Sequence, residues 1–95
     1  MKTIMIHGNQ MTSRSKTIEY LKHIFEIEYC QGSNLDALWD CMGENRLDEE
    51  TVIYIFDEES IYNYLGTYGI KVMRFINALP KLNDKYLVKT EEDFK

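Results

Sequence analysis

Residues 51–56 have the sequence TVIYIF, a run of six β-forming residues without polar alternation. A strand with one solvated face alternates apolar and polar side chains, whereas a strand that is covered on both faces is continuously apolar. The segment Thr51–Phe56 therefore predicts a buried strand, and we expect it to be the central strand of a sheet.

Helical patterns occupy the segments on both sides of this strand. Apolar residues recur there at spacings of three and four, which is the helical period. The predicted helices cover approximately Ser15–Phe25, Leu35–Met42, Glu58–Leu65 and Thr67–Leu79. We expect Gly66 to end the third helix and Pro80 to stop the fourth.

Two further strands complete the pattern, one near each end of the chain. Lys2–His7 is a short β-rich run closed by a glycine, and Lys85–Lys89 precedes a charged tail. The order β-α-α-β-α-α-β places helices between consecutive strands, as parallel pairing requires. The sequence therefore predicts an α/β fold with a small three-stranded parallel sheet and about four helices.

Length and composition indicate one small folded domain over residues 1–95. A chain of 95 residues and 11.3 kDa is too short for two hydrophobic cores. Its 44% hydrophobic and 13% aromatic residues, with a single proline, exclude disordered and low-complexity classes. We expect the domain to fold alone and to be monomeric.

The N-terminal segment and the cysteines indicate a cytoplasmic protein. Residues 1–6 have too few strongly apolar side chains for a signal peptide, and no run approaches the length of a membrane span. Cys30 and Cys41 are eleven residues apart, a spacing that matches neither a paired metal site nor a thioredoxin-like motif. We therefore expect reduced thiols, no disulfide and no contact with a membrane.

The net charge is negative and unevenly distributed. A charge of −5 and a pI near 4.9 disfavour direct binding of nucleic acid, whose phosphates attract basic proteins. Residues 36–59 hold nine acidic residues and one basic residue, a net charge of −8, while the rest of the chain carries +3. Such a run is either an ordinary solvated face or an electrostatic field that attracts a basic partner.

The helix predicted over Leu35–Met42 presents two carboxylates beside an indole. At about 100° per residue, its apolar side chains form one arc. Asp36 and Asp40 occupy the opposite face, and Trp39 lies at the border. The helix dipole compensates Asp36, near the N-terminus, more than Asp40. A solvated helix face explains the pattern in ordinary terms, and a cationic group of a partner is the alternative.

Residues 32–41, GSNLDALWDC, closely resemble the motif G-x-N-L-D-A-L-W-D-C of the barstar family, whose members are intracellular inhibitors of secreted bacterial ribonucleases. The length, the opening strand and the element order resemble the family as well. The resemblance implies a barstar-like fold, no catalytic activity and a basic, secreted, barnase-type ribonuclease as partner. It also implies that the acidic helix blocks the ribonuclease active site by imitating RNA phosphate, because charge-assisted hydrogen bonds to arginine are strong.

The resemblance assigns partner-binding roles to individual residues. Asp40 matches the family's principal anchor in the ribonuclease active site, and Asp36 matches a second acidic contact. Asn34 matches a family contact and also suits the helix N-cap. Trp39 matches an aromatic residue beside the interface, and Gly32 matches the turn that opens the binding loop.

The periphery of the motif departs from the family. Where the family has two tyrosines before the glycine, this chain has Cys30 and Gln31, and Tyr29, the candidate aromatic contact, is displaced by one residue. Glu44–Asn45 stands where the family has Gly-Trp, and Asn77 replaces an acidic contact. Retained anchors with a changed periphery predict a related but different ribonuclease as partner.

Two other classes of function compete with inhibition. An enzyme would use Asp36 and Asp40 as a carboxylate pair, but two side chains on one face of one helix cannot easily flank a substrate bond. His7 and His23 are isolated, so we expect no metal site and no cofactor. The remaining alternative is a barstar-like regulatory module that binds a different basic partner without inhibiting a ribonuclease.

Overall fold

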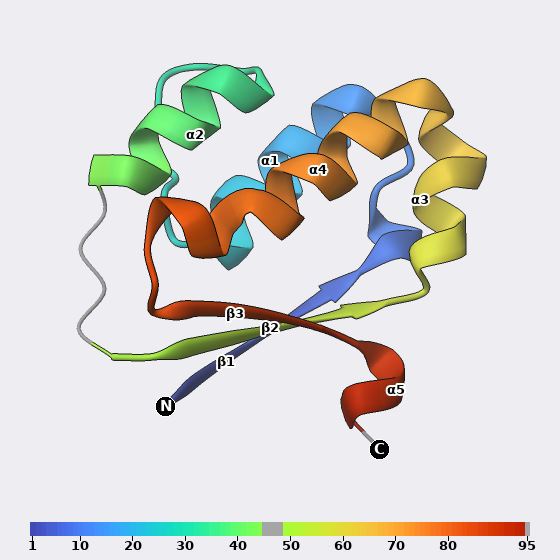
Figure 1. Cartoon of the computed structure of the whole chain (residues 1–95). Helices are drawn as coiled ribbons and strands as arrows, with labels where there is room; N and C mark the ends of the chain where they lie inside the picture. Colours follow the sequence, from blue (N-terminus) through green and yellow to red (C-terminus); the bar gives the residue numbers. More distant parts are fainter. Residues whose placement is uncertain (45–48, 95) are drawn as a thin grey trace.

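Three parallel strands form one sheet in the computed structural model, which describes residues 1–44 and 49–94 (Figure 1). The strands are β1 (Lys2–His7), β2 (Thr51–Phe56) and β3 (Tyr86–Thr90), in the order β1-β2-β3. β2 pairs in parallel with both neighbours. The predicted α/β fold with a three-stranded parallel sheet is therefore confirmed, and the segment 51–56 is its central strand.

Helices connect the strands and cover one face of the sheet. All four predicted helices are present, as α1 (Arg14–Ile24), α2 (Leu35–Glu44), α3 (Glu58–Leu65) and α4 (Thr67–Leu82), and the 3-10 turn η1 (Gly8–Gln10) precedes them. Figure 1 shows these helices above the sheet and a short helix, α5 (Glu91–Phe94), below it. Within residues 1–44 and 49–94, no helix has the length and apolar character needed to cross a membrane.

α4 extends beyond Pro80, so the prediction that this proline stops the helix is wrong. A proline removes one backbone donor, which near the end of a helix costs a single hydrogen bond. The helix continues past the proline, and the Asn83 N–H donates a hydrogen bond to the Leu79 carbonyl at 3.0 Å. Leu79 is fully buried and Leu82 packs against the core. Packing on both sides of the proline therefore holds the last turn.

The C-terminal residues form α5 in place of the predicted charged tail. The ring of Phe94 lies edge-on to the rings of Tyr54 and Phe56 on β2, with centroids 5.0 Å and 5.3 Å apart. The Asp93 carboxylate accepts a hydrogen bond from the Thr90 N–H at 3.1 Å, which caps the turn. These ring contacts join residues about forty positions apart, so the local sequence does not indicate them.

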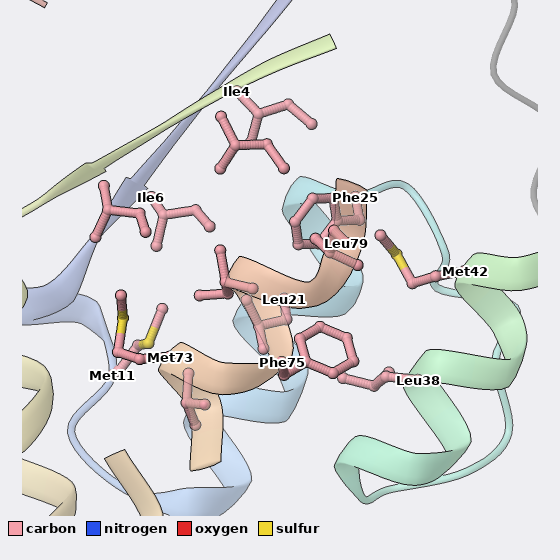
Figure 2. Packing of buried hydrophobic residues seen from close by; sticks show 14 of the residues in the cluster. Ile4, Ile6, Met11, Leu21, Phe25, Leu38, Met42, Met73, Phe75 and Leu79 are labelled. Carbon is pink, nitrogen blue, oxygen red and sulfur yellow. The ribbon is translucent and has the colours of Figure 1, made fainter. Parts of the chain in front are cut away.

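The hydrophobic core lies between the sheet and the helices (Figure 2). The parallel register places Ile4 beside Ile53 and Ile6 beside Ile55, and all four side chains are buried. Buried side chains of α1 and α4 pack onto this apolar surface. The two helices therefore form the layer that shields this face of the sheet from water.

α2 joins this core from its margin. Its buried side chains Leu38 and Met42 point toward Phe75 and Leu79 of α4 (Figure 2). One side of α2 is thus covered by protein, and the opposite side is left to solvent.

Tyr86 makes a pH-dependent contribution to stability. Its side chain is buried and lies edge-on to Phe25, with ring centroids 6.3 Å apart. Burial, with a smaller effect of the nearby Tyr29 phenol, raises the pKa of Tyr86 to about 12. The unfolded chain releases this proton near its ordinary pKa of about 10. The contribution is therefore complete below about pH 10 and is lost as the pH rises through about 12.

We expect Tyr86→Phe to weaken this alkaline loss, because the substituted ring has no proton to release. The urea midpoint of the wild-type protein should fall steeply between about pH 9.5 and pH 11.5, and that of the variant should fall less. Circular dichroism at both pH values measures the midpoints, with the exposed Tyr64→Phe as the matched control. Identical losses in wild type and Tyr86→Phe would contradict the assignment.

Candidate functional site

α2 divides into a buried side and an exposed acidic side. Leu38 is 0% exposed and Met42 is 2% exposed, whereas Asp36 and Asp40 are both exposed. Trp39 is half-buried at the border between the two sides. The division that the helical period predicts is therefore confirmed.

Asn34 caps the N-terminus of α2. Its Oδ1 atom accepts a hydrogen bond from the Ala37 N–H at 2.8 Å, and its backbone carbonyl accepts one from the Leu38 N–H at 3.1 Å. The predicted N-cap is confirmed, since an Asn oxygen satisfies one of the free amides at the helix start. The cap uses the side-chain oxygen, which leaves the NH2 group as the part of Asn34 that could bind a partner.

The loop before α2 runs close along that helix. Gly32 permits this approach, because a Cβ atom at its position would overlap the Cβ of Ala37. The Lys22 ammonium on α1 donates a hydrogen bond to the Cys30 carbonyl at 2.8 Å. The loop is therefore held between α1 and α2, and Gly32 has a packing role in it.

A disulfide joins Cys30 of this loop to Cys41 of α2, so the expectation of two reduced thiols is wrong. The separation of eleven residues matches no local motif, and only the path of the loop brings the two residues together. Their Cα atoms are 6.1 Å apart, within the usual range for a disulfide. The bond ties the loop to α2 at the residue that follows Asp40.

A groove of about 560 Å³ lies between α2 and α4. The rings of Trp39 and Phe75, which line it, meet edge-on with centroids 5.8 Å apart and planes at 72°. The lining residues of the two helices and the cap are Asn34, Leu35, Asp36, Trp39, Tyr68, Lys71, Arg74, Phe75 and Ala78. Aromatic and charged side chains thus meet in one concave surface.

The groove brings three of the predicted site residues together, namely Asn34, Asp36 and Trp39. Asp40 follows Asp36 by one helical turn on the exposed side of α2. Tyr29 is 58% exposed on the loop and does not line the groove. Tyr29 therefore lies outside the groove, as Gly32 and Asp40 also do.

The two cations on the α4 wall of the groove, Lys71 and Arg74, are absent from the sequence-based candidates. Tyr68, Lys71 and Arg74 line this wall, and the two cationic side chains are exposed. Their spacing of three residues places them on one side of a helix, which the sequence could have shown. The helix that lies opposite Lys71 and Arg74 is determined by tertiary packing, and the helical period of the sequence does not indicate it.

The charged side chains of this surface have no ion-pair partner within residues 1–44 and 49–94. The ion pairs found there do not include Asp36 or Asp40 of α2, nor Lys71 or Arg74 of α4. Those pairs join the N-terminus to Glu49, Lys2 to Glu26, and His23 to Glu28. Both signs of charge on this surface are thus available to an incoming molecule.

β2 divides the acidic segment of residues 36–59 in space. Glu49 and Glu50 precede the strand, whereas the acids at 57–59 follow it at the start of α3. A six-residue strand spans about 20 Å, roughly twice the screening length of physiological salt. Figure 1 also shows α2 and α3 at opposite ends of the helical layer. The field at α2 is therefore weaker than the sequence total of −8 suggests.

The histidines have structural neighbours. His7 stacks on Phe56 with ring centroids 5.2 Å apart, and His23 Nδ1 lies 3.0 Å from a Glu28 carboxylate oxygen. In the described part of the chain, no three His, Cys, Asp or Glu side chains are grouped so that they could hold a metal ion. The chemistry of the candidate site rests on carboxylates, cations and aromatic rings.

Comparison with known proteins identifies a matching family and a similar protein. The model of a protein family described as Barstar (barnase inhibitor) matches residues 1–86. The chain is also similar to a Bacillus subtilis (strain 168) protein named "Putative ribonuclease inhibitor YrdF", with 28% identity over 92 residues. That alignment covers 96% of this chain and 100% of the relative. Both matches include α2, the loop before it and all of α4.

We expect the disulfide to stabilise the protein by about 3 kcal/mol, because it closes a loop of about twelve residues and restricts the unfolded chain. Cys41→Ser, or reduction of the wild-type protein, should lower the free energy of unfolding by that amount in urea titrations. Ellman's reagent should find no free thiol in the unreduced, denatured wild-type protein and one in Cys41→Ser. Two free thiols in the unreduced wild-type protein would show that the bond does not form.

Proposed function

The chain belongs to the barstar family, and we propose that it binds and blocks the active site of a basic, secreted ribonuclease of the barnase type. One observation carries the proposal: α2 exposes Asp36 and Asp40, which have no ion-pair partner in the described residues. Family membership and the named relative support the kind of partner. The free carboxylates supply a means of binding it, without a cofactor or a catalytic step.

Exposed carboxylates can take the place of RNA phosphate in a ribonuclease active site. Cationic side chains hold the phosphate there, and their charge-assisted hydrogen bonds to a carboxylate are short and strong. We assign the central contact to Asp40, which lies a turn beyond the helix N-terminus and gains little from its dipole. Asp36, in the first turn, is the second acidic contact.

The surroundings of the two carboxylates suit a contact surface. Trp39 adds a half-buried indole, an amphipathic group that is common at interfaces. Asn34 adds its free NH2 group, and Tyr29 offers an exposed phenol on the adjoining loop. Gly32 and the disulfide hold that loop against α2. A surface that is ordered before binding loses less conformational entropy when the partner arrives.

We further propose that the protein acts as a monomer in the cytoplasm, where it protects the producing cell from the ribonuclease before secretion. The Cys30–Cys41 disulfide bears on this location, because cytoplasmic reductants keep most thiols reduced. Cys30 is 4% exposed, so burial limits access of a reductant to its sulfur. Alkylation of thiols in freshly lysed cells would show which form the cytoplasm holds.

Asp40→Ala should weaken inhibition far more than Asp36→Ala. Removing one member of a buried interfacial charge pair costs about 2–5 kcal/mol, which corresponds to roughly 30-fold to several thousandfold in affinity. Barnase and a fluorogenic RNA substrate provide the assay, and both variants should keep melting temperatures close to that of the wild type.

The matched control for these variants is Glu59→Ala, which removes the same charge from an exposed position on α3. We expect little change in inhibition, because α3 lies away from α2. Equal inhibition by wild type and Asp40→Ala would remove Asp40 from the interface. No inhibition of barnase or of related basic ribonucleases at any concentration would favour the module with a different basic partner.

The changed periphery should make this chain a weaker inhibitor of barnase than barstar is. Cys30 and Gln31 replace the family's tyrosines, and Asn77 replaces an acidic contact, so contacts around the anchors are lost. Parallel titrations of the two inhibitors against barnase give the comparison. Equal potency would show that these three substitutions are neutral.

A further inference from the structure

The groove between α2 and α4 carries opposite charges on its two walls. Asp36 lies on the α2 wall, and Lys71 and Arg74 lie on the α4 wall. All three side chains are exposed, and none is in an ion pair with another described residue. The basic wall stands out because the whole chain has a net charge of −5.

Apolar surface lies between the two charged walls. Trp39 and Phe75 meet edge-on there, and Leu35 and Ala78 are half-buried beside them. Tyr68 closes the end toward α1, where the Arg14 guanidinium lies 4.7 Å from its ring centroid. Burial raises the pKa of Tyr68, the larger effect, and Arg14 lowers it. This end of the groove is thus aromatic and flanked by a cation.

The exposed cations of α4 gain from an anion brought by another molecule. Lys71 and Arg74 are three residues apart on a helix, so their like charges repel each other mildly. A carboxylate placed between them would replace that repulsion with two charge-assisted hydrogen bonds. A polyanion such as RNA fits less well, because Asp36 on the facing wall and Asp40 beside it would repel successive phosphates.

We propose that this groove binds a surface loop of the partner ribonuclease in which a large apolar side chain is adjacent to an aspartate or glutamate. The apolar side chain packs on Trp39 and Phe75, and the carboxylate pairs with Lys71 and Arg74. The inference rests on the proposed function and adds a specificity determinant to it. α2 would bind the basic active site, and α4 would select ribonucleases that carry an acidic residue at this point.

The groove can be tested with the free protein and short peptides. The probes are acetyl-Phe-Asp-amide, its charge-reversed partner acetyl-Phe-Lys-amide, and uridine 5′-monophosphate. Trp39 is the only tryptophan of the chain, so its indole N–H gives a single marker in ¹H–¹⁵N spectra. We expect saturable shifts of this signal and of α4 amides with the Phe-Asp peptide, at millimolar affinity and at least fivefold tighter than with the Phe-Lys peptide.

Charge reversal on α4 should reverse this preference. Lys71→Glu/Arg74→Glu should bind the Phe-Lys peptide more tightly than the Phe-Asp peptide. The control Lys16→Glu/Lys81→Glu makes the same change in net charge at exposed positions outside the groove, and it should behave as the wild type does. Equal binding of both peptides, or no shift at Trp39, would overturn the proposal. Tighter binding of the nucleotide than of either peptide would assign the cations to phosphate instead.

An inhibition assay separates this inference from the proposed function. With a ribonuclease that the wild type inhibits, Lys71→Glu/Arg74→Glu should raise the inhibition constant at least tenfold, with Lys16→Glu/Lys81→Glu as control. An unchanged constant beside a large effect of Asp40→Ala would overturn the role of the groove alone. Peptide binding without inhibition of any ribonuclease would instead overturn the proposed function.

Discussion

The central strand β2 pairs in parallel with a strand on each edge, and this parallel pairing determines how the rest of the chain is arranged. Parallel neighbours need crossover connections, and such crossovers are almost always right-handed. The order β1-β2-β3 steps across the sheet in one direction, so two crossovers of the same hand place both helix pairs on the same face. Figure 1 shows this arrangement, with α5 on the other face. Ring contacts of Phe94 with Tyr54 and Phe56 then cover part of that open face.

Because all four main helices share one face, α2 is displaced to its margin. α1 and α4 pack over the sheet, and α2 reaches the core through Leu38 and Met42 against α4. A helix attached by one side would be free to tilt, but the close contact of Gly32 with Ala37 and the Cys30–Cys41 bond restrict it. The exposed carboxylates are therefore carried on a helix of defined orientation, which favours binding by lowering the entropy lost on association.

Local sequence was sufficient for the parts of the structure that local forces determine. The six residues of β2, the helical periods and the division of α2 into two sides depend on neighbours within a few positions, and each is confirmed. The errors concern contacts between distant residues. The disulfide depends on the path of the loop, α5 depends on rings of β2, and α4 passes Pro80 because Leu82 packs against the core. The groove also depends on contacts between distant residues, since it forms where α2 and α4 meet.

Net charge alone describes this surface poorly. The acids at the start of α3 lie about 20 Å beyond those that precede β2, so they add little at physiological salt to the field that a partner meets at α2. On the other side of α2, Lys71 and Arg74 introduce positive charge within the groove itself. A partner that approaches this surface therefore meets carboxylates on one helix and cations on the next. Such a pattern favours binding of a partner whose positive and negative groups lie opposite these carboxylates and cations. A uniformly acidic face would attract any basic protein.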